Sequence, residues 1–362
     1  MHRLSILTAA LVIVATFASP GVAPAEPGGW DFRLASMPAG VTSGGQLAID
    51  EHRGKLFVTD NTFPATTTKE GLTVQKPNID VSVVSLAARR PVGSIDLSDQ
   101  PWGLFKYQSV KVPMPQIADG IAVDSAAGAL VTTSAHADGV SIVRADARKA
   151  TPDDLLAYPG GHPMGVVAAG GRAWVALFSA NKVVLLDTAT KRQIAQSSVF
   201  SPTLVSLDSA RHRLYVGNDD HKNRRRNFVA VIDTRTNKVV KEVSTPSNSR
   251  PTVDPVTGRV FAASFDTGEV SVIDPDSLRV VKTIATRSTP NQIAVDGKRR
   301  LGYLANLDNR SITVIDLDTA SVLAVVKTAA RVHTLAVDQR TGIVYGSQYR
   351  GSGITVLVPS RR

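Results

Sequence analysis

A repeat of about 42 residues constrains the fold of this chain more than any other feature of its sequence. The clearest copy is Thr289–Lys327, in which four short runs rich in Val and Ile are separated by Asp, Asn, Gly or Arg. Short runs of this kind between turn-forming residues are typical of antiparallel strands. Four strands in each repeat indicate the blade of a β-propeller, because a horseshoe repeat has a shorter period and a helical half.

The number of blades is given by an Asp that closes the first strand of each copy. The last four of these Asp residues are separated by 46, 42 and 42 residues, and a seventh copy is degenerate because Ala169 stands in the Asp position. The Asp residues are Asp50, Asp124, Asp208, Asp254, Asp296 and Asp338. The count predicts seven blades. Each Asp is expected to serve the following turn by accepting hydrogen bonds from backbone amides.

The two ends of the propeller are predicted to meet in one blade. The last repeat, Arg331–Val358, has three strands, and Trp30–Ser36 has the pattern of a lone strand ahead of the first repeat. Two unpaired edges would leave backbone donors and acceptors exposed. We therefore expect an all-β, seven-bladed β-propeller of four-stranded antiparallel blades, closed by the N-terminal strand in the last blade.

Residues 1–25 are predicted to lie outside this fold. A basic start, an apolar run at Leu4–Ala18 and a small-residue site at Ala23–Ala25 match a secretory signal peptide. The apolar run is shorter than the roughly 20 residues that span a bilayer. We expect residues 26–362 to form one propeller domain without a membrane span. The protein would then be secreted or extracytoplasmic, at the cell envelope.

The composition limits the chemistry that the chain can carry out. It contains no Cys, which excludes disulfides and thiolate nucleophiles or ligands. Its 41 Lys and Arg residues outnumber its 31 Asp and Glu residues, giving a formal net charge of +10. This excess favours anionic partners, although charge also serves solubility alone. Hydrolase, phosphate-loop and zinc-helix motifs are absent from the sequence, so no catalytic residue and no cofactor is predicted.

The second strand of several copies resembles the YVTN family of β-propeller repeats. These strands read LFVTD, LYVGN, GYLAN and VYGSQ, at Leu56–Asp60, Leu214–Asn218, Gly302–Asn306 and Val344–Gln348. The resemblance extends over nearly all of the chain after residue 25. It implies the propeller fold and a binding role, since known relatives include exported and cell-surface binding proteins, some of which bind nucleic acid. More distant seven-bladed relatives are lactonases and a streptogramin-type lyase.

Three insertions are expected on the same face of the ring. Asn61–Asn78 and Asp219–Asn227 fall between the second and third strands of their blades, and Ser98–Gln116 connects two blades. In an antiparallel blade these connections share one face, while the other two turns share the opposite face. Long loops on a rigid scaffold commonly carry binding sites. We therefore expect a ligand on the face that carries the insertions.

Polar residues just before the innermost strands are predicted to surround the mouth of the central channel on that face. Arg250 and Arg331 give this ring an excess of positive charge, which suits a carboxylate or another anion. Alternatively, the ring only solvates the channel and caps the strand ends. The predicted ligand-binding residues are Asp119, His162, Arg250, Asn291, Arg331 and His333, with Thr203 in the same ring.

A second candidate surface is the basic insertion His221–Asn227. Its cations are Lys222, Arg224, Arg225 and Arg226, which would contact phosphates of a polyanion. The aromatic residues of Trp102–Tyr107 would add a stacking platform only if that insertion folds toward the basic loop. The alternative is a solvated loop with no partner.

Together these features favour a monomeric binding module for an anionic ligand or an envelope partner. No metal site is predicted, because the four histidines of this face, His136, His162, His221 and His333, lack the local spacing of metal ligands. Two competing interpretations stay open. One is a nucleic-acid binder that uses the basic loop, and the other is a lactonase- or lyase-like enzyme with His162, His333 and Asp119 at the channel mouth.

Overall fold

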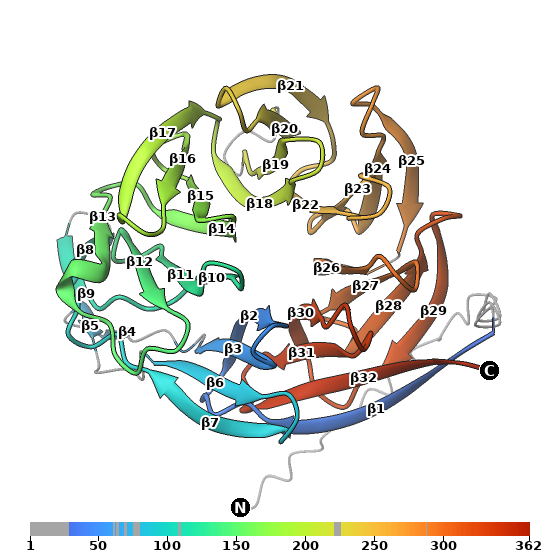
Figure 1. Ribbon diagram of the computed structural model, residues 1–362, viewed down its shortest axis with the longest axis horizontal. Helices are drawn as coiled ribbons and strands as arrows, with labels where there is room; N and C mark the ends of the chain where they lie inside the picture. Colours follow the sequence, from blue (N-terminus) through green and yellow to red (C-terminus); the bar gives the residue numbers. More distant parts are fainter. Residues whose placement is uncertain are drawn as a thin grey trace, which may run out of the picture.

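The Val- and Ile-rich runs of each repeat form four antiparallel strands, and seven such sheets surround a central channel (Figure 1). The computed structural model describes residues 29–60, 62, 65–68, 71–74, 80–107, 110–220, 226–286 and 288–362. The seven-bladed propeller predicted from the repeat is therefore confirmed. The predicted signal peptide, residues 1–25, lies outside the described residues.

The blades follow the chain in order, and the first strand of each blade lies nearest the channel (Figure 1). From the inner to the outer strand, blade one is β2 (Gly44–Asp50), β3 (Lys55–Asp60), β6 (Val81–Ser85) and β7 (Arg90–Ile95), and blade two is β10 (Gly120–Asp124), β11 (Ala129–Ser134), β12 (Gly139–Arg144) and β13 (Leu155–Ala157). Blade three is β14 (Pro163–Ala169), β15 (Arg172–Leu177), β16 (Lys182–Asp187) and β17 (Arg192–Ser198). Blade four is β18 (Pro202–Asp208), β19 (Arg213–Asn218), β20 (Phe228–Asp233) and β21 (Lys238–Ser244). Blades five to seven are β22 (Ser249–Val253), β23 (Val260–Ser264), β24 (Glu269–Ile273) and β25 (Val280–Ala285); β26 (Pro290–Asp296), β27 (Leu301–Asn306), β28 (Ser311–Asp316) and β29 (Ser321–Lys327); β30 (Val332–Val337), β31 (Val344–Gln348), β32 (Gly353–Arg361) and β1 (Trp30–Pro38).

Blade seven is built from both ends of the described chain. The N-terminal strand β1 pairs antiparallel with β32, with Trp30 opposite Arg361 and Pro38 opposite Gly353. The guanidinium of Arg361 lies over the Trp30 ring, 5.0 Å from its centroid. The predicted closure is thus confirmed, and the outer strand of the last blade comes from the start of the fold rather than from its end.

Neighbouring blades are held together by the middle strands, whose side chains are buried on both faces. In β27, Tyr303 packs with residues of blade seven, such as Val332, whereas the next residue, Leu304, packs with Phe261 and Val270 of blade five. Successive side chains of a strand point to opposite faces, so each strand contacts the blade on either side. This pattern explains why the runs are continuously apolar rather than alternating.

The Asp that closes each inner strand has the predicted structural role. Its carboxylate accepts a hydrogen bond from a backbone amide two or three residues later, as in Val256 N to Asp254 (3.1 Å) and Arg299 N to Asp296 (3.0 Å). Asp338 does the same for Arg340 N at 3.0 Å. These residues belong to the scaffold and not to a ligand site.

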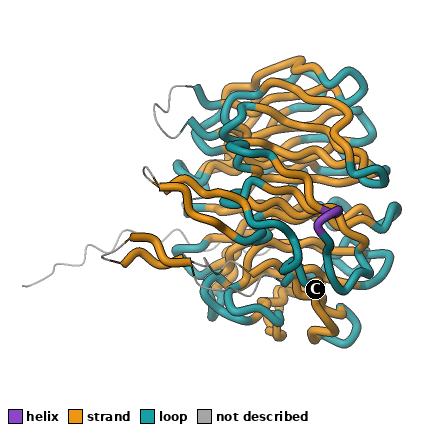
Figure 2. Tube along the Cα trace, turned by 90° about the vertical axis from the view of Figure 1, so that its left-hand side faces the viewer, coloured by secondary structure: helices purple, strands orange, loops and turns teal. Residues whose placement is uncertain are grey.

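Two of the three predicted insertions contain hairpins that project from the same face of the ring, and the third, Asp219–Asn227, is described only at its ends. The first contains the hairpin β4 (Ala65–Thr68) and β5 (Gly71–Val74), and the second forms β8 (Gly103–Tyr107) and β9 (Val110–Met114). Both hairpins project to the left in Figure 2, whereas the helical turn η1 (Pro152–Asp154) lies toward the opposite face. Among the described residues, no helix is long and apolar enough to cross a membrane.

Candidate ligand site at the channel mouth

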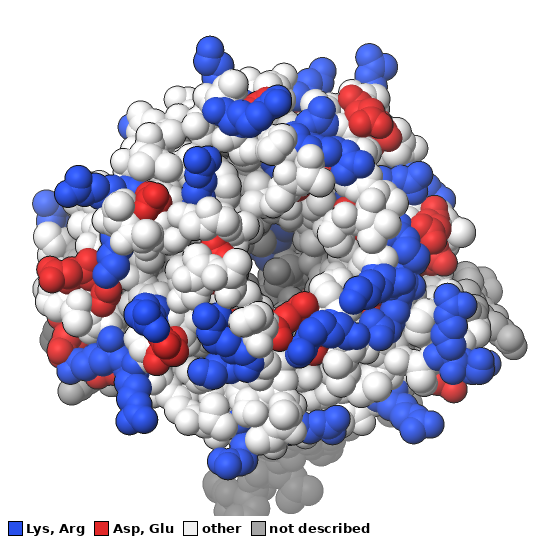
Figure 3. Space-filling view, viewed as in Figure 1, with Lys and Arg blue, Asp and Glu red and all other residues white. Residues whose placement is uncertain are grey.

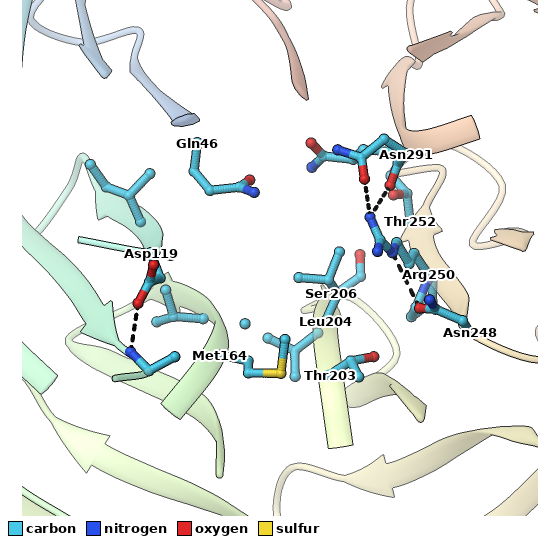
Figure 4. Close-up of a pocket in the computed structure, with 18 of the residues that line it drawn as sticks. Gln46, Asp119, Met164, Thr203, Leu204, Ser206, Asn248, Arg250, Thr252 and Asn291 are labelled. Atoms are coloured by element: carbon cyan, nitrogen blue, oxygen red, sulfur yellow. Dashed lines mark hydrogen bonds between the residues drawn. The ribbon is translucent and has the colours of Figure 1, made fainter. Parts of the chain in front are cut away.

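The channel opens on the insertion-bearing face into a cavity of about 720 Å³ (Figure 4). A volume of this size is in the range of small-molecule sites. Six residues of the predicted ring line the cavity, namely Asp119, His162, Thr203, Arg250, Asn291 and His333. Arg331 does not line it: its side chain is exposed, and His333, two residues later in blade seven, lines the cavity instead.

Arg250, on β22, provides the positive charge of the cavity. Its Nη1 donates to the backbone oxygen of Asn291 at 2.6 Å and also to the side-chain oxygen of Asn291, and its Nε donates to Oδ1 of Asn248 at 3.4 Å (Figure 4). The guanidinium carbon lies 5.1 Å from the ring centroid of Phe265, within cation–π range. These contacts orient the guanidinium, and all of its hydrogen-bond acceptors are neutral.

The surroundings of Arg250 lower its pKa, but the guanidinium stays charged at neutral pH. Burial lowers the pKa of Arg250 to about 10, although the carboxylates of Asp219 and Asp266 act in the opposite direction. A half-buried cation whose hydrogen bonds go to neutral oxygens is solvated less well than in water. An anion that enters the cavity would therefore find a charged donor that is already oriented.

Three blades are connected by hydrogen bonds at this side of the cavity. Arg250 of blade five donates to Asn291 of blade six, and Nδ2 of Asn291 donates to the backbone oxygen of His333 in blade seven at 2.6 Å. Burial and the charge of Arg250 lower the pKa of His333 to about 4. His333 is therefore neutral at pH 7, and Arg250 is the cation of this wall, with Asp219 of blade four also lining the cavity.

The cavity also contains buried polar atoms that lack a hydrogen-bond partner. They are Oγ1 of Thr203, Oε1 of Gln292 and Nδ1 of His333. Thr203 is only 5% exposed, so bulk solvent satisfies its hydroxyl poorly. A ligand with hydroxyl groups beside its anionic group would satisfy such atoms, because a hydroxyl both donates and accepts.

Asp119 lies across the cavity from Arg250 (Figure 4). Its Oδ2 accepts a hydrogen bond from Ala135 N at 2.7 Å and lies 3.7 Å from Nδ1 of His136. The rings of His136 and His162 are in edge contact, with centroids 5.6 Å apart. Burial, and then the proximity of His136, lower the pKa of His162. The structure thus places His136 beside Asp119 and His162, a contact that the sequence did not predict.

Local irregularity in the inner strands explains why other lining residues were missed. The predicted ring contains only residues at the start of each inner strand, whereas Gln46, Met164 and Gln292 also line the cavity. Strands β2, β14, β18, β26 and β30 each have a shift in register near their first residues. A β-bulge breaks strict alternation, so that neighbours such as Asn291 and Gln292 both reach the channel. No sequence signal marks these bulges.

The basic loop is described only at its ends. Lys222, Arg224 and Arg225 lie outside the described residues, and their predicted role in binding a polyanion stays a prediction. Arg226 forms an ion pair with Glu242 at 2.9 Å, and its guanidinium lies 5.5 Å from the ring centroid of Phe200 and 5.4 Å from that of Phe228. Arg226 therefore contributes to packing of its own blade.

Metal ligands do not converge in the described part of the chain. Within these residues, no group of three or more His, Asp or Glu side chains has the geometry to hold a metal ion. His162 lies on blade three and His333 on blade seven, and each borders the same cavity from its own blade. His221, the remaining histidine of this face, is outside the described residues.

Comparisons with known proteins support the fold and leave the ligand open. No protein-family model matches the chain. A stretch of 123 residues is 27% identical to "Uncharacterized protein YncE" of Salmonella typhi, and the same values hold for the protein of that name from Salmonella typhimurium. The match covers 32% of this chain and 33% of the relative, so the chain spans about a third of the length of these curated relatives.

A solved structure has the same architecture. "Kuenenia stuttgartiensis Hydrazine Synthase" superimposes with a TM-score of 0.63, covering 89% of this chain and 96% of that chain, at 15% sequence identity. Identity this low shows the fold alone. The two comparisons and the seven closed blades support placing the chain among β-propeller proteins, while the YVTN family stays a resemblance carried by the strand motifs.

Proposed function

We propose that this chain is an exported β-propeller binding protein that takes up a small organic anion in the cavity at its channel mouth. One observation carries the proposal: the half-buried guanidinium of Arg250 faces this cavity, and its hydrogen bonds go to the neutral oxygens of Asn291 and Asn248. A guanidinium held in this way forms stronger hydrogen bonds with an anion than with these neutral oxygens, because hydrogen bonds to a charged acceptor are stronger than those to a neutral one.

The remaining lining residues favour a carboxylate that also carries hydroxyl groups. The unpartnered atoms of Thr203, Gln292 and His333 include hydrogen-bond acceptors and a hydroxyl, and a purely apolar acid would leave them unsatisfied. A 2-hydroxy acid satisfies both needs, with its carboxylate at Arg250 and its hydroxyl at one of these atoms.

Export and location rest on the sequence alone. The pattern of residues 1–25 supports a secretory signal peptide, and the cell envelope is the proposed site of action. Binding of an envelope polymer or of nucleic acid by Lys222, Arg224 and Arg225 is a weaker alternative, because Arg226 is already paired with Glu242. An enzyme at the same cavity would use Asp119 with His136 or His162.

Isothermal titration calorimetry with lactate, propionate and propane-1,2-diol tests the proposal at low ionic strength. We expect lactate to bind more tightly than propionate, and the uncharged diol not to bind. Arg250→Gln should weaken lactate binding about tenfold or more, and Arg250→Lys should be intermediate because an ammonium lacks the planar fork. Lys241→Gln, on the exposed side of β21, is the matched control for loss of one charge. Equal lactate affinity in Arg250→Gln and Lys241→Gln would refute the proposed site.

A further inference from the structure

A second cavity lies beside the channel mouth, beneath the hairpin β8–β9. Its volume is about 640 Å³, and its walls come from the hairpin and from turns of blades two and three. It shares His136 and His162 with the channel cavity, so these two rings separate the two spaces. We call this second cavity the side groove, and we define it by Trp102, Leu104, Phe105, Lys106, Lys111 and His136.

The hairpin is fixed to blade two at its base, which makes the groove a formed feature. Gln116 Nε2 donates to the backbone oxygen of Pro101 at 2.9 Å, and Ser141 Oγ donates to Oε1 of Gln100 at 2.6 Å. Gly103 lies so close to the backbone of Ala137 that a Cβ at this position would clash with its carbonyl group. Only glycine allows the strand to approach blade two this closely.

Exposed apolar surface lines the groove. Trp102 is 50% exposed and Leu104 is 55% exposed. The Phe105 ring makes an edge contact with His136 at a centroid distance of 4.9 Å, and His136 contacts His162 in the same manner. Exposed apolar groups gathered in a concave site indicate a ligand surface. A row of rings favours a flat aromatic ligand over a flexible chain.

Positive charge lies at the outer part of the same groove. Lys106 and Lys111 are directly opposite each other in the register of β8 and β9, and both are exposed. Neither ammonium forms an ion pair with a carboxylate of the described chain. Like charges at directly opposed positions destabilise a hairpin, and an anion between them relieves the repulsion.

One acidic residue also lines the groove. Asp138 also lines the groove, but its two carboxylate oxygens accept hydrogen bonds from Gly160 N at 2.7 Å and His162 N at 2.9 Å. These hydrogen bonds hold the connection between blades two and three, and the carboxylate keeps its negative charge. The groove therefore combines apolar side chains with two exposed cations and one carboxylate.

We propose that the side groove binds a flat aromatic carboxylate, with its rings against Trp102 and Leu104 and its carboxylate between Lys106 and Lys111. This site is separate from the proposed lactate site, because its charge comes from the hairpin rather than from Arg250. A ligand in the groove contacts His136, whose ring also faces Asp119 in the channel cavity. The two sites therefore share a wall while differing in ligand.

Calorimetry with 2-naphthoate and its uncharged analogue 2-naphthol at pH 7.5 tests the proposal on the mature chain. We expect 2-naphthoate to bind at least fivefold more tightly than 2-naphthol. The double variant Lys106→Gln, Lys111→Gln should weaken 2-naphthoate at least fivefold and leave 2-naphthol unchanged. Trp102→Leu, which keeps an apolar side chain, should weaken both. The double variant Lys241→Gln, Lys327→Gln removes the same charge from exposed outer-strand positions and should change neither.

Three results would overturn the side groove as an aromatic-anion site. The first is equal affinity for 2-naphthoate and 2-naphthol, and the second is an equal effect of the two lysine pairs on 2-naphthoate binding. The third is loss of 2-naphthoate binding in Arg250→Gln, which would place this ligand in the channel cavity. Lactate titrations of the Lys106→Gln, Lys111→Gln variant keep the two proposals apart, because the proposed lactate site contains Arg250 and neither of these lysines.

Discussion

The two faces of the propeller use arginine in opposite ways. On the face shown in Figure 3, basic and acidic side chains lie side by side around the central opening. Arg53 and Arg211, for example, pair with the Asp three residues earlier, at 2.9 and 3.2 Å. On the insertion-bearing face, Arg250 instead donates to amide oxygens. The paired arginines recur with the repeat and stabilise the scaffold, whereas Arg250 donates to neutral oxygens inside the candidate site.

The paired arginines also join successive blades. Arg53 of blade one donates to the backbone oxygen of Ser125 in blade two at 2.9 Å, and Arg211 of blade four donates to that of Thr257 in blade five at 3.0 Å. Each of these arginines therefore pairs with the Asp of its own turn and donates a hydrogen bond to the corresponding turn of the next blade. The comparison predicts that changes on this face affect stability and that changes on the other face affect binding.

The largest effect is expected for Asp254→Ala on the turn face. Asp254 is fully buried and forms an ion pair with Arg300 of blade six at 2.8 Å. Removing one partner of a buried pair costs about 3–5 kcal/mol, and because Arg300 keeps its ion pair with Asp318 at 2.8 Å we expect a loss at the lower end of this range. We expect urea unfolding to show a loss of this size, with lactate affinity of the folded protein unchanged.

Asp274→Ala provides the matched control for this change. Asp274 serves an outer turn, where its Oδ1 accepts from Ser277 N at 2.8 Å, and it is only partly buried. Its loss should lower stability by about 1 kcal/mol. If both variants lose the same stability, the bridge between blades five and six contributes nothing beyond an ordinary turn.

A smaller effect on stability is expected from His333 on the cavity face, and it depends on pH. Its pKa is about 4 in the folded protein and 6.5 in an unperturbed chain. The unfolded chain therefore binds a proton more readily, so stability should be constant above pH 6.5 and fall as the pH decreases toward 4. The expected loss is about 2 kcal/mol, less than the full shift implies, because the side chain is partly exposed.

Urea unfolding of wild type and His333→Leu between pH 7.5 and 4 measures the contribution of His333 to the pH dependence of stability. The variant should lose less stability than wild type over this interval. His212→Asn, at an exposed turn position with φ of 53°, is the control, since Asn tolerates this backbone conformation. Identical pH profiles for wild type and His333→Leu would show that the buried imidazole does not contribute to acid sensitivity.

The smallest effect on stability is expected from substituting two glycines of the turn face. Comparing the two substitutions tests the arginine bridges between blades. Gly258 and Gly54 both have a left-handed backbone, with φ of 75° and 61°. A Cβ at Gly258 would clash with the guanidinium of Arg211, whereas a Cβ at Gly54 would have no neighbour within 4 Å. Gly54→Ala should cost about 1 kcal/mol from backbone strain, and Gly258→Ala about 1 kcal/mol more. Equal losses in thermal unfolding would mean that Arg211 moves aside freely.

Particular residues show how far the candidate site was predictable. Arg250, Asn291 and His333 were placed at one opening because the repeat assigns each of them to the start of an inner strand. Gln292 and Met164 were missed because β-bulges bring successive residues to the same side. Trp102 and Phe105 were noted as a possible platform for the basic loop, but the hairpin that contains them lines the side groove with His136 instead.

The sequence by itself determined the seven blades, the pairing of its first and last strands, the structural role of the repeated Asp residues and the shared face of the insertions. All of these follow from periodicity and from the fixed alternation of turns in an antiparallel blade, which are local rules. The tertiary structure alone decided which side chains meet: Asp119 with His136, Arg250 with Asn291, and the hairpin lysines with the aromatic groove. Such contacts depend on ring closure, on bulges in the inner strands and on the docking of an insertion, and no local pattern specifies those three-dimensional relations.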